Sequence, residues 1–125
     1  MSNFISLNGT VFQPELRKTQ SGKSIFAFNL SYYDGKGADG KAKYGNIRVK
    51  AWEALGENAA AILKEKDRAI VCGKLTHEKW QAKDGSNRSR EVIIASSIGQ
   101  EISMFAQNGG GFGSENYPDD EQIPF

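Results

Sequence analysis

The sequence has little of what disulfide or metal stabilisation requires. It contains one cysteine, Cys72, and one histidine, His77. A single cysteine cannot form an intrachain disulfide, and these two residues cannot supply the ligands of a structural zinc site. We therefore expect a fold that depends on its apolar core, in a reducing, cytoplasmic compartment.

Long apolar runs are also missing. No stretch approaches the ~18 apolar residues that a membrane-spanning helix needs, and residues 1–4 show no basic region followed by an apolar run. We expect neither export nor insertion into a membrane.

The patterns that catalysis requires are absent as well. His77 has no nucleophile near it in the sequence, and the run Gly109–Gly113 lacks the Lys and Ser/Thr of a phosphate-binding loop. Asp34 and Asp39 do not have the spacing of a calcium loop, and the lysines around them would repel a cation. The sequence therefore predicts a protein that is not an enzyme and has no metal site and no cofactor.

The charges are unevenly placed. Residues 1–107 hold all sixteen Lys and Arg and eleven Asp and Glu, a net charge of +5, whereas residues 108–125 hold four acidic residues and no basic one, a net charge of −4. A basic body with an acidic end often accompanies nucleic-acid binding. An ordinary mixed surface followed by a solubilising tail is the alternative.

The apolar periodicity predicts a mainly β-stranded domain. Alternation indicates strands over 4–12, 25–33, 44–52, 69–80 and 88–97, the last with an extension through Phe105, and helical spacing covers 53–66 with Leu55, Ala59, Ile62 and Leu63 on one stripe. Gly9 is a candidate bend, Gln13 and Pro14 are expected to end the first strand, and 34–43 is expected to be an exposed, mobile hairpin loop. Three strands, one helix and two strands is the order of an all-β, five-stranded OB-fold barrel with its helix between strands three and four.

The chain divides into two parts by composition. Residues 1–107 form the predicted barrel domain. Residues 108–125 have too little apolar content to pack, so we expect a disordered Gly-rich linker that ends in an acidic tip.

The third predicted strand has one apolar face and one face that mixes cations with aromatic rings. The second face carries Tyr44, Asn46, Arg48, Lys50 and Trp52. Cations follow phosphates and aromatic rings stack on bases, so this face suits unpaired DNA. Packing against another subunit is the alternative, although Arg48 and Lys50 are poor choices for a dry interface.

Trp80 ends the fourth predicted strand, next to Lys79 and close to Lys83. A buried core position is the usual place for tryptophan. The flanking lysines instead favour partial exposure and contact with a base.

The last eight residues, 118–125, place an acidic run before a terminal Ile-Pro-Phe. Such a segment can seat Phe125 in an apolar pocket while basic residues hold the carboxylates. We favour a peptide ligand for other proteins over a tail that only aids solubility.

Four stretches carry a family resemblance: 14–17 (Pro-Glu-Leu-Arg), 48–52 (Arg-Val-Lys-Ala-Trp), 73–80 with Gly85 after it, and the closing 119–125. With these the chain resembles the bacterial single-stranded DNA-binding protein family over nearly its whole length. The resemblance implies an OB-fold, sequence-independent binding of single-stranded DNA, a homotetramer around which DNA wraps, and a place in the cytoplasm with the nucleoid. It also implies base stacking on Trp52 and Trp80.

The resemblance and the strand pattern together define the candidate residues. For DNA they are Tyr32, Tyr33, Tyr44, Arg48, Lys50, Trp52, Lys74, Lys79, Trp80, Arg88 and Arg90. For replication, recombination and repair proteins, which dock on the tip in this family, they are Asp119, Asp120, Glu121, Gln122, Ile123, Pro124 and Phe125.

The chain departs from the family pattern at two places. Many members begin the third strand with Trp-His-Arg, where this chain has Asn46-Ile47-Arg48. The tryptophan often found between strands two and three is absent, and Tyr32, Tyr33 and Tyr44 are the candidates to replace it. Two other functions stay open: an OB-fold that binds RNA or acts in primosome assembly, and a protein-interaction barrel whose basic face binds acidic peptides.

Overall fold

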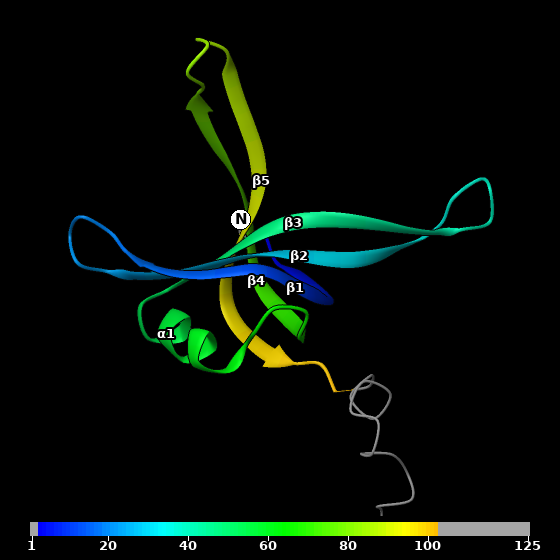
Figure 1. The fold of residues 1–125 in the computed structure, drawn as a ribbon, viewed down its shortest axis with the longest axis horizontal. Helices are drawn as coiled ribbons and strands as arrows, with labels where there is room; N and C mark the ends of the chain where they lie inside the picture. Colours follow the sequence, from blue (N-terminus) through cyan, green and yellow to red (C-terminus); the bar gives the residue numbers. More distant parts are fainter. Residues whose placement is uncertain (1–2, 103–125) are drawn as a thin grey trace, which may run out of the picture.

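A computed structural model describes residues 3–102, so the acidic tip and the linker before it lie outside the described residues. The elements are β1 (Ile5–Lys18), β2 (Ser24–Lys36), β3 (Ala42–Trp52), α1 (Glu53–Ile62), β4 (Arg68–Gln81) and β5 (Asn87–Gln100). The strands close into a barrel in the order β1-β2-β3-β5-β4 (Figure 1). Only β3 and β5 pair in parallel among these neighbours. This architecture confirms the predicted OB-fold with its helix between β3 and β4. Within residues 3–102, no helix combines the length and the apolar character required to cross a bilayer.

Alternating residues of the five strands fill the barrel. Its fully buried side chains include Val11, Phe28, Leu30, Val49 and Ile93, one or more from each of β1, β2, β3 and β5. The helix α1 lies across one end of the barrel and adds Ala59 and Leu63 to the same core. Burial of branched and aromatic side chains of this size contributes roughly 1.5–3 kcal/mol each.

The helix is shorter than the predicted 53–66. It ends at Ile62, and Leu63 caps it by donating its backbone N–H to the carbonyl of Ala59 at 2.8 Å. Because Leu63 takes the inward position just beyond the helix, Ile62 is left 54% exposed. Ile62 still lines one surface together with Leu55, Ala59 and Leu63, as the predicted stripe requires, but it is not part of the core.

The first strand does not end at Gln13 and Pro14. It continues to Lys18 through a bulge, where the pairing with β2 shifts between Phe12 and Glu15 and Gln13 has a φ of 55°. Proline is tolerated at a bulge because the ladder bond that it cannot donate is already interrupted there. The consequence is that Glu15 and Arg17 run alongside β2.

Gly9 lies close to the point where β1 stops pairing with β4 and begins pairing with β2. Up to Thr10 the strand pairs with β4, and from Thr10 onward it pairs with β2. A Cβ atom at Gly9 would lie 2.2 Å from the backbone oxygen of Ser31, so only glycine permits this close approach. This agrees with the predicted bend that lets the barrel close.

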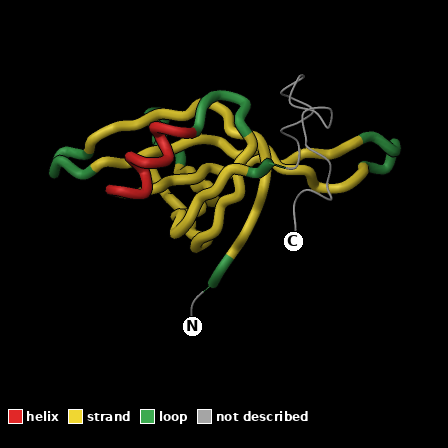
Figure 2. The backbone as a smooth tube through the Cα atoms, turned by 90° about the horizontal axis from the view of Figure 1, so that it is seen from below, coloured by secondary structure: helices red, strands yellow, loops and turns green. Residues whose placement is uncertain are grey.

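Three hairpins extend beyond the barrel. The β1–β2 and β2–β3 hairpins point in opposite directions, and the β4–β5 hairpin forms a third arm (Figures 1 and 2). Half of the predicted loop over 34–43 is strand, because the turn needs only residues 37–41. Gly37 donates to the carbonyl of Lys41 at 2.9 Å, and Gly40 supplies a φ of 81°. The β5 strand likewise reaches Gln100, and residues 103–105 of its predicted extension are outside the described range.

Candidate nucleic-acid interface

The outer surface of β1, β2 and β3 is organised in cross-strand rows. Read from β1 to β3, two rows are Arg17–Ile25–Trp52 and Glu15–Ala27–Lys50, and two more on β2 and β3 are Asn29–Arg48 and Tyr33–Tyr44. The rows span the nine residues from Tyr44 to Trp52, about 26 Å of strand. The predicted alternation of β3 is thus confirmed, because Val49 and Ala51 are fully buried while Trp52 is 39% exposed.

Arg48 is held in place by side chains of the two neighbouring strands. Its Nη1 donates to Oδ1 of Asn29 at 3.2 Å, and Nδ2 of Asn29 donates to Oε1 of Gln13 at 2.8 Å. The Nε atom of Arg48 is buried and has no partner among the described residues. Burial, and next the charge of Arg90, lower the pKa of Arg48 from its ordinary value.

Glu78 joins the barrel to the β4–β5 hairpin. Its carboxylate accepts hydrogen bonds from Nζ of Lys50 on β3 and, at 3.2 and 3.1 Å, from Nε and Nη2 of Arg90 on β5. Burial alone would raise the pKa of Glu78, but the hydrogen bonds and charges of Lys50 and Arg90 outweigh burial and lower that pKa below its ordinary value. The carboxylate therefore stays ionised at neutral pH and neutralises part of this basic surface.

Trp80 is presented on the same hairpin. It is 45% exposed, and the guanidinium carbon of Arg90 lies 5.3 Å from its ring centroid. This cation–π contact orients one side of the indole and fixes Arg90 at the same time. The predicted partial exposure of Trp80 is confirmed.

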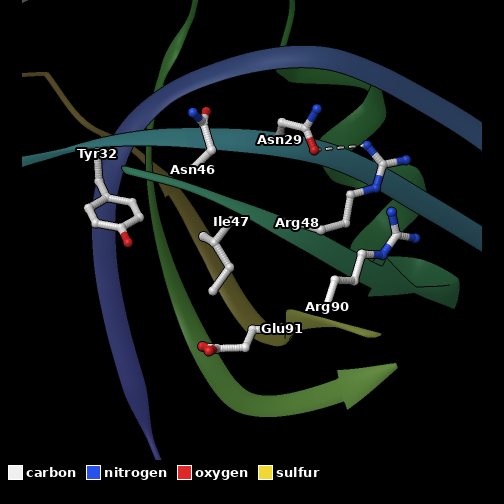
Figure 3. Close-up of a pocket in the computed structure, with 7 residues that line it drawn as sticks. All are labelled: Asn29, Tyr32, Asn46, Ile47, Arg48, Arg90 and Glu91. Atoms are coloured by element: carbon white, nitrogen blue, oxygen red, sulfur yellow. Dashed lines mark hydrogen bonds between the residues drawn. The ribbon is translucent and has the colours of Figure 1, made fainter. Parts of the chain in front are cut away.

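Three hollows meet at Arg90. One of about 460 Å³ runs past Ile47 and Arg48, one of about 620 Å³ is lined by Glu78, Lys79, Trp80 and Arg90, and one of about 160 Å³ lies between Arg48, Lys50 and the first two strands. Figure 3 shows the first, with the guanidinium groups of Arg48 and Arg90 side by side. Arg90 lines all three, and we call the three neighbouring hollows together the interface groove.

The tyrosines divide into two sites. Tyr33 and Tyr44 face each other across the β2–β3 hairpin, both exposed, with ring centroids 6.0 Å apart and planes at 71°. Tyr32 lines the 460 Å³ hollow instead. Its ring covers Gly45, where a Cβ atom would lie 2.4 Å from Cζ of Tyr32.

The structure thus gathers some of the predicted DNA-binding residues and separates others. Arg48, Lys50, Lys79, Trp80 and Arg90 line the interface groove, and Trp52 lies in the row next to Lys50. Arg88 is opposite Trp80 near the hairpin end, where its Nη2 pairs with Asp84 at 3.7 Å. Lys74 is exposed further along β4, opposite Ile94. Whether each of these residues touches DNA stays a prediction.

Sequence reasoning missed Gln13, Asn29 and Glu78. Asn29 had a signal, since it is the polar residue between Phe28 and Leu30 and so points outward on the same sheet face as Arg48. No feature of the sequence pointed to Glu78, because its contacts depend on how β4 and β5 are aligned with β3. Among residues 3–102 no three His, Cys, Asp or Glu side chains converge in a way that would hold a metal ion.

A closed OB-fold barrel with cations and exposed aromatic rings on its outer strands defines a nucleic-acid-binding OB-fold protein. Residues 2–101 match the model of the single-strand binding protein family, and the chain belongs to that family.

Individual relatives agree with this assignment. The single-stranded DNA-binding protein of Mycobacterium tuberculosis is 30% identical over 118 residues, which cover 84% of this chain and 71% of the relative. That of Thermus thermophilus is 28% identical over 126 residues, covering 90% of this chain and 47% of the relative. The crystal structure of the small single-stranded DNA-binding protein from Streptomyces coelicolor superposes with a TM-score of 0.63 at 22% identity, over 82% of this chain and 97% of that chain. At that identity the superposition shows the shared fold.

Proposed function

We propose that this protein binds and protects single-stranded DNA during replication, recombination and repair. The observation that carries the proposal is the interface groove of a member of the single-strand binding family, in which Arg90 lies against the exposed ring of Trp80 and also lines a hollow with Arg48 and Lys50. Cations attract the phosphates and exposed rings stack on bases, each base contributing about 1–3 kcal/mol. Both contacts are available with any base, so binding is largely independent of sequence.

The direct test compares a single strand with the duplex of the same sequence. A duplex keeps its base faces stacked, so we expect strong preference for the single strand. The logarithm of affinity should fall with the logarithm of salt concentration with a slope of about −0.7 per phosphate contacted. Equal affinity for the two forms would overturn the proposal.

The same titration separates the alternative ligands. Competition between an oligo-dT and an RNA of equal length distinguishes a DNA-binding from an RNA-binding OB-fold. Absence of any shift of a single strand in a gel at moderate salt would instead favour a barrel that binds acidic peptides. The expected outcome is a shift with DNA that RNA displaces poorly.

The finer parts of the proposal concern assembly. Following the family, we propose that four copies form a homotetramer around which DNA wraps, with residues 1–107 as the DNA-binding unit. The mass in solution, measured with and without poly-dT, tests the tetramer. A chain ending at residue 107 should keep its DNA affinity if this unit is sufficient.

We also propose that the segment Asp119–Phe125 recruits replication and repair proteins. Support comes from its sequence, in which acidic residues precede an apolar Ile-Pro-Phe. Phe125→Ala removes the apolar anchor and leaves every acidic side chain, so DNA binding should hardly change while partner docking is lost. A pull-down from host lysate with both proteins tests this, and identical partners would show that the segment only aids solubility.

A further inference from the structure

The 460 Å³ hollow of the interface groove differs in chemistry from a stacking platform. Two arginines, two asparagines, one tyrosine and one glutamate surround a single apolar side chain, that of Ile47. The hollow therefore presents a surface rich in hydrogen-bonding groups.

The donors and acceptors of this hollow are separated in space. In Figure 3 the guanidinium groups of Arg48 and Arg90 lie on one side of Ile47, and the Glu91 carboxylate and the Tyr32 hydroxyl lie on the other. Arginine can only donate hydrogen bonds, and an ionised glutamate can only accept them. A planar ligand over Ile47 would therefore need acceptors along one edge and donors along another.

The arginine side is prepared for such a ligand. Asn29 fixes one nitrogen of Arg48, while Nε of the same guanidinium is buried without a partner among the described residues. Arg90 is fixed by Glu78 and Trp80, so neither guanidinium needs to be ordered when the ligand arrives.

Among the four bases, guanine has the complementary pattern. Its N7 and O6 are acceptors and are the usual partners of arginine, and its amino group is a donor. Adenine and cytosine would turn an amino donor toward the arginines in the place of O6, and thymine has no amino group to offer Glu91. We propose that this hollow holds one guanine base of the bound strand, which gives an otherwise sequence-independent interface a preference at one position. This inference rests on the proposed binding of single-stranded DNA.

The test uses the full chain and oligo-dT of about 15 nucleotides, a length that covers an OB-fold site. One central thymidine is replaced by deoxyguanosine, deoxyadenosine or deoxycytidine, and the dissociation constants are measured by competition at one salt concentration. We expect the guanine oligomer to bind at least about fivefold more tightly than the other three, the lower limit for one specific bidentate contact. The adenine oligomer is the control for stacking, because any purine stacks better than a pyrimidine.

Two modified bases test the individual contacts. 7-Deazaguanine lacks the N7 acceptor and inosine lacks the amino donor, so each should lose most of the preference.

Glu91→Gln should weaken the preference, so that the guanine dissociation constant divided by the thymine dissociation constant rises toward one, and a general effect of charge cancels in this ratio. Glu57→Gln is the matched control, because it removes the same charge from α1 and glutamine can still accept the bond from Ser24. This control should leave the ratio unchanged.

The outcomes separate the two proposals. Tight binding of all four oligomers within about twofold overturns the guanine site and leaves single-strand binding intact. The same follows if Arg48→Lys weakens all four oligomers equally without changing the ratio, because the hollow then holds a phosphate. Failure of every oligomer to bind, the plain oligo-dT included, overturns the proposed function itself.

Discussion

Glu78 is the residue on which the charge of the interface groove depends. Its carboxylate already forms ion pairs with Lys50 and Arg90, two of the cations that line the interface groove and could otherwise contact a phosphate. A bound strand must therefore displace this carboxylate or share the cations with it. Glu78 limits affinity while it holds Arg90 in place beside the tryptophan ring.

Replacement of this carboxylate should strengthen DNA binding. Glu78→Gln frees the two cations, and partly exposed ion pairs of this kind are worth about 0.2–1 kcal/mol, so affinity should rise by up to roughly fivefold at low salt. Screening should reduce the gain as salt is added. Titration of oligo-dT at several salt concentrations checks this against Glu57→Gln, and weaker binding of Glu78→Gln would mean that the carboxylate serves mainly to position Arg90.

The same carboxylate should make stability depend on pH. The pKa of Glu78 is lowered in the folded state, so its contribution is present above the pKa of the unfolded chain, about 4, and is lost as pH falls through the folded value. The difference in free energy of unfolding between wild type and Glu78→Gln should therefore shrink below about pH 4. Denaturant unfolding at a series of pH values measures it, and a difference that is constant from neutral to acid pH would contradict the assignment.

The two tryptophans offer the direct test of stacking. Trp52→Ala and Trp80→Ala should each weaken binding of a single strand by about 1–3 kcal/mol. Trp80 lies on the projecting hairpin, so its loss should leave the free energy of unfolding nearly unchanged. If Trp52→Ala unfolds the domain or splits the oligomer while each folded barrel keeps its affinity, Trp52 has a structural role.

At the scale of elements, apolar periodicity was sufficient to locate every strand of the barrel and the helix α1, because burial of one face imposes a period of two on a strand and of 3.6 on a helix. It could not show that β1 continues past Pro14, since a bulge is decided by pairing with β2 and not by the strand's own residues. The contacts of the candidate site could not be predicted for the same reason. Arg48 and Lys50 were visible on one strand, whereas the contacts with Glu78 and Asn29 arise only from the registers between strands.

Gly9 lies where β1 stops pairing with β4 and begins pairing with β2, and we predict that this position tolerates only glycine. Gly9→Ala places a Cβ atom against the backbone oxygen of Ser31, which cannot rotate away, so the strands must separate at a cost of about 1–3 kcal/mol. Gly99→Ala in β5 is the matched control, because no atom lies within 4 Å of its new Cβ. Denaturant unfolding should show a loss for the first variant and little change or a small gain for the second. Equal stability of the two variants would mean that the barrel closes without this constraint.

The whole chain combines a body of net charge +5 with an acidic segment of net charge −4. The eighteen residues from Ile102 to Asp119 can span at most about 60 Å, so the acidic residues can reach the interface groove of the same barrel or of a neighbouring one. Covalent attachment of this kind gives an effective concentration in the millimolar range. The segment should therefore compete weakly with DNA phosphates for Arg48, Lys50 and Arg90.

Removal of residues 119–125 should then raise the affinity for oligo-dT modestly at low salt. The gain should fade as the Debye length shortens toward about 8 Å at physiological ionic strength, because the competition is electrostatic. Phe125→Ala leaves the acidic side chains in place and is the matched control, which should bind DNA as the wild type does. Titrations of the three proteins across a range of salt concentrations measure the effect. A gain that persists at high salt, or one that Phe125→Ala reproduces, would show that the segment meets the barrel through apolar contact instead of charge.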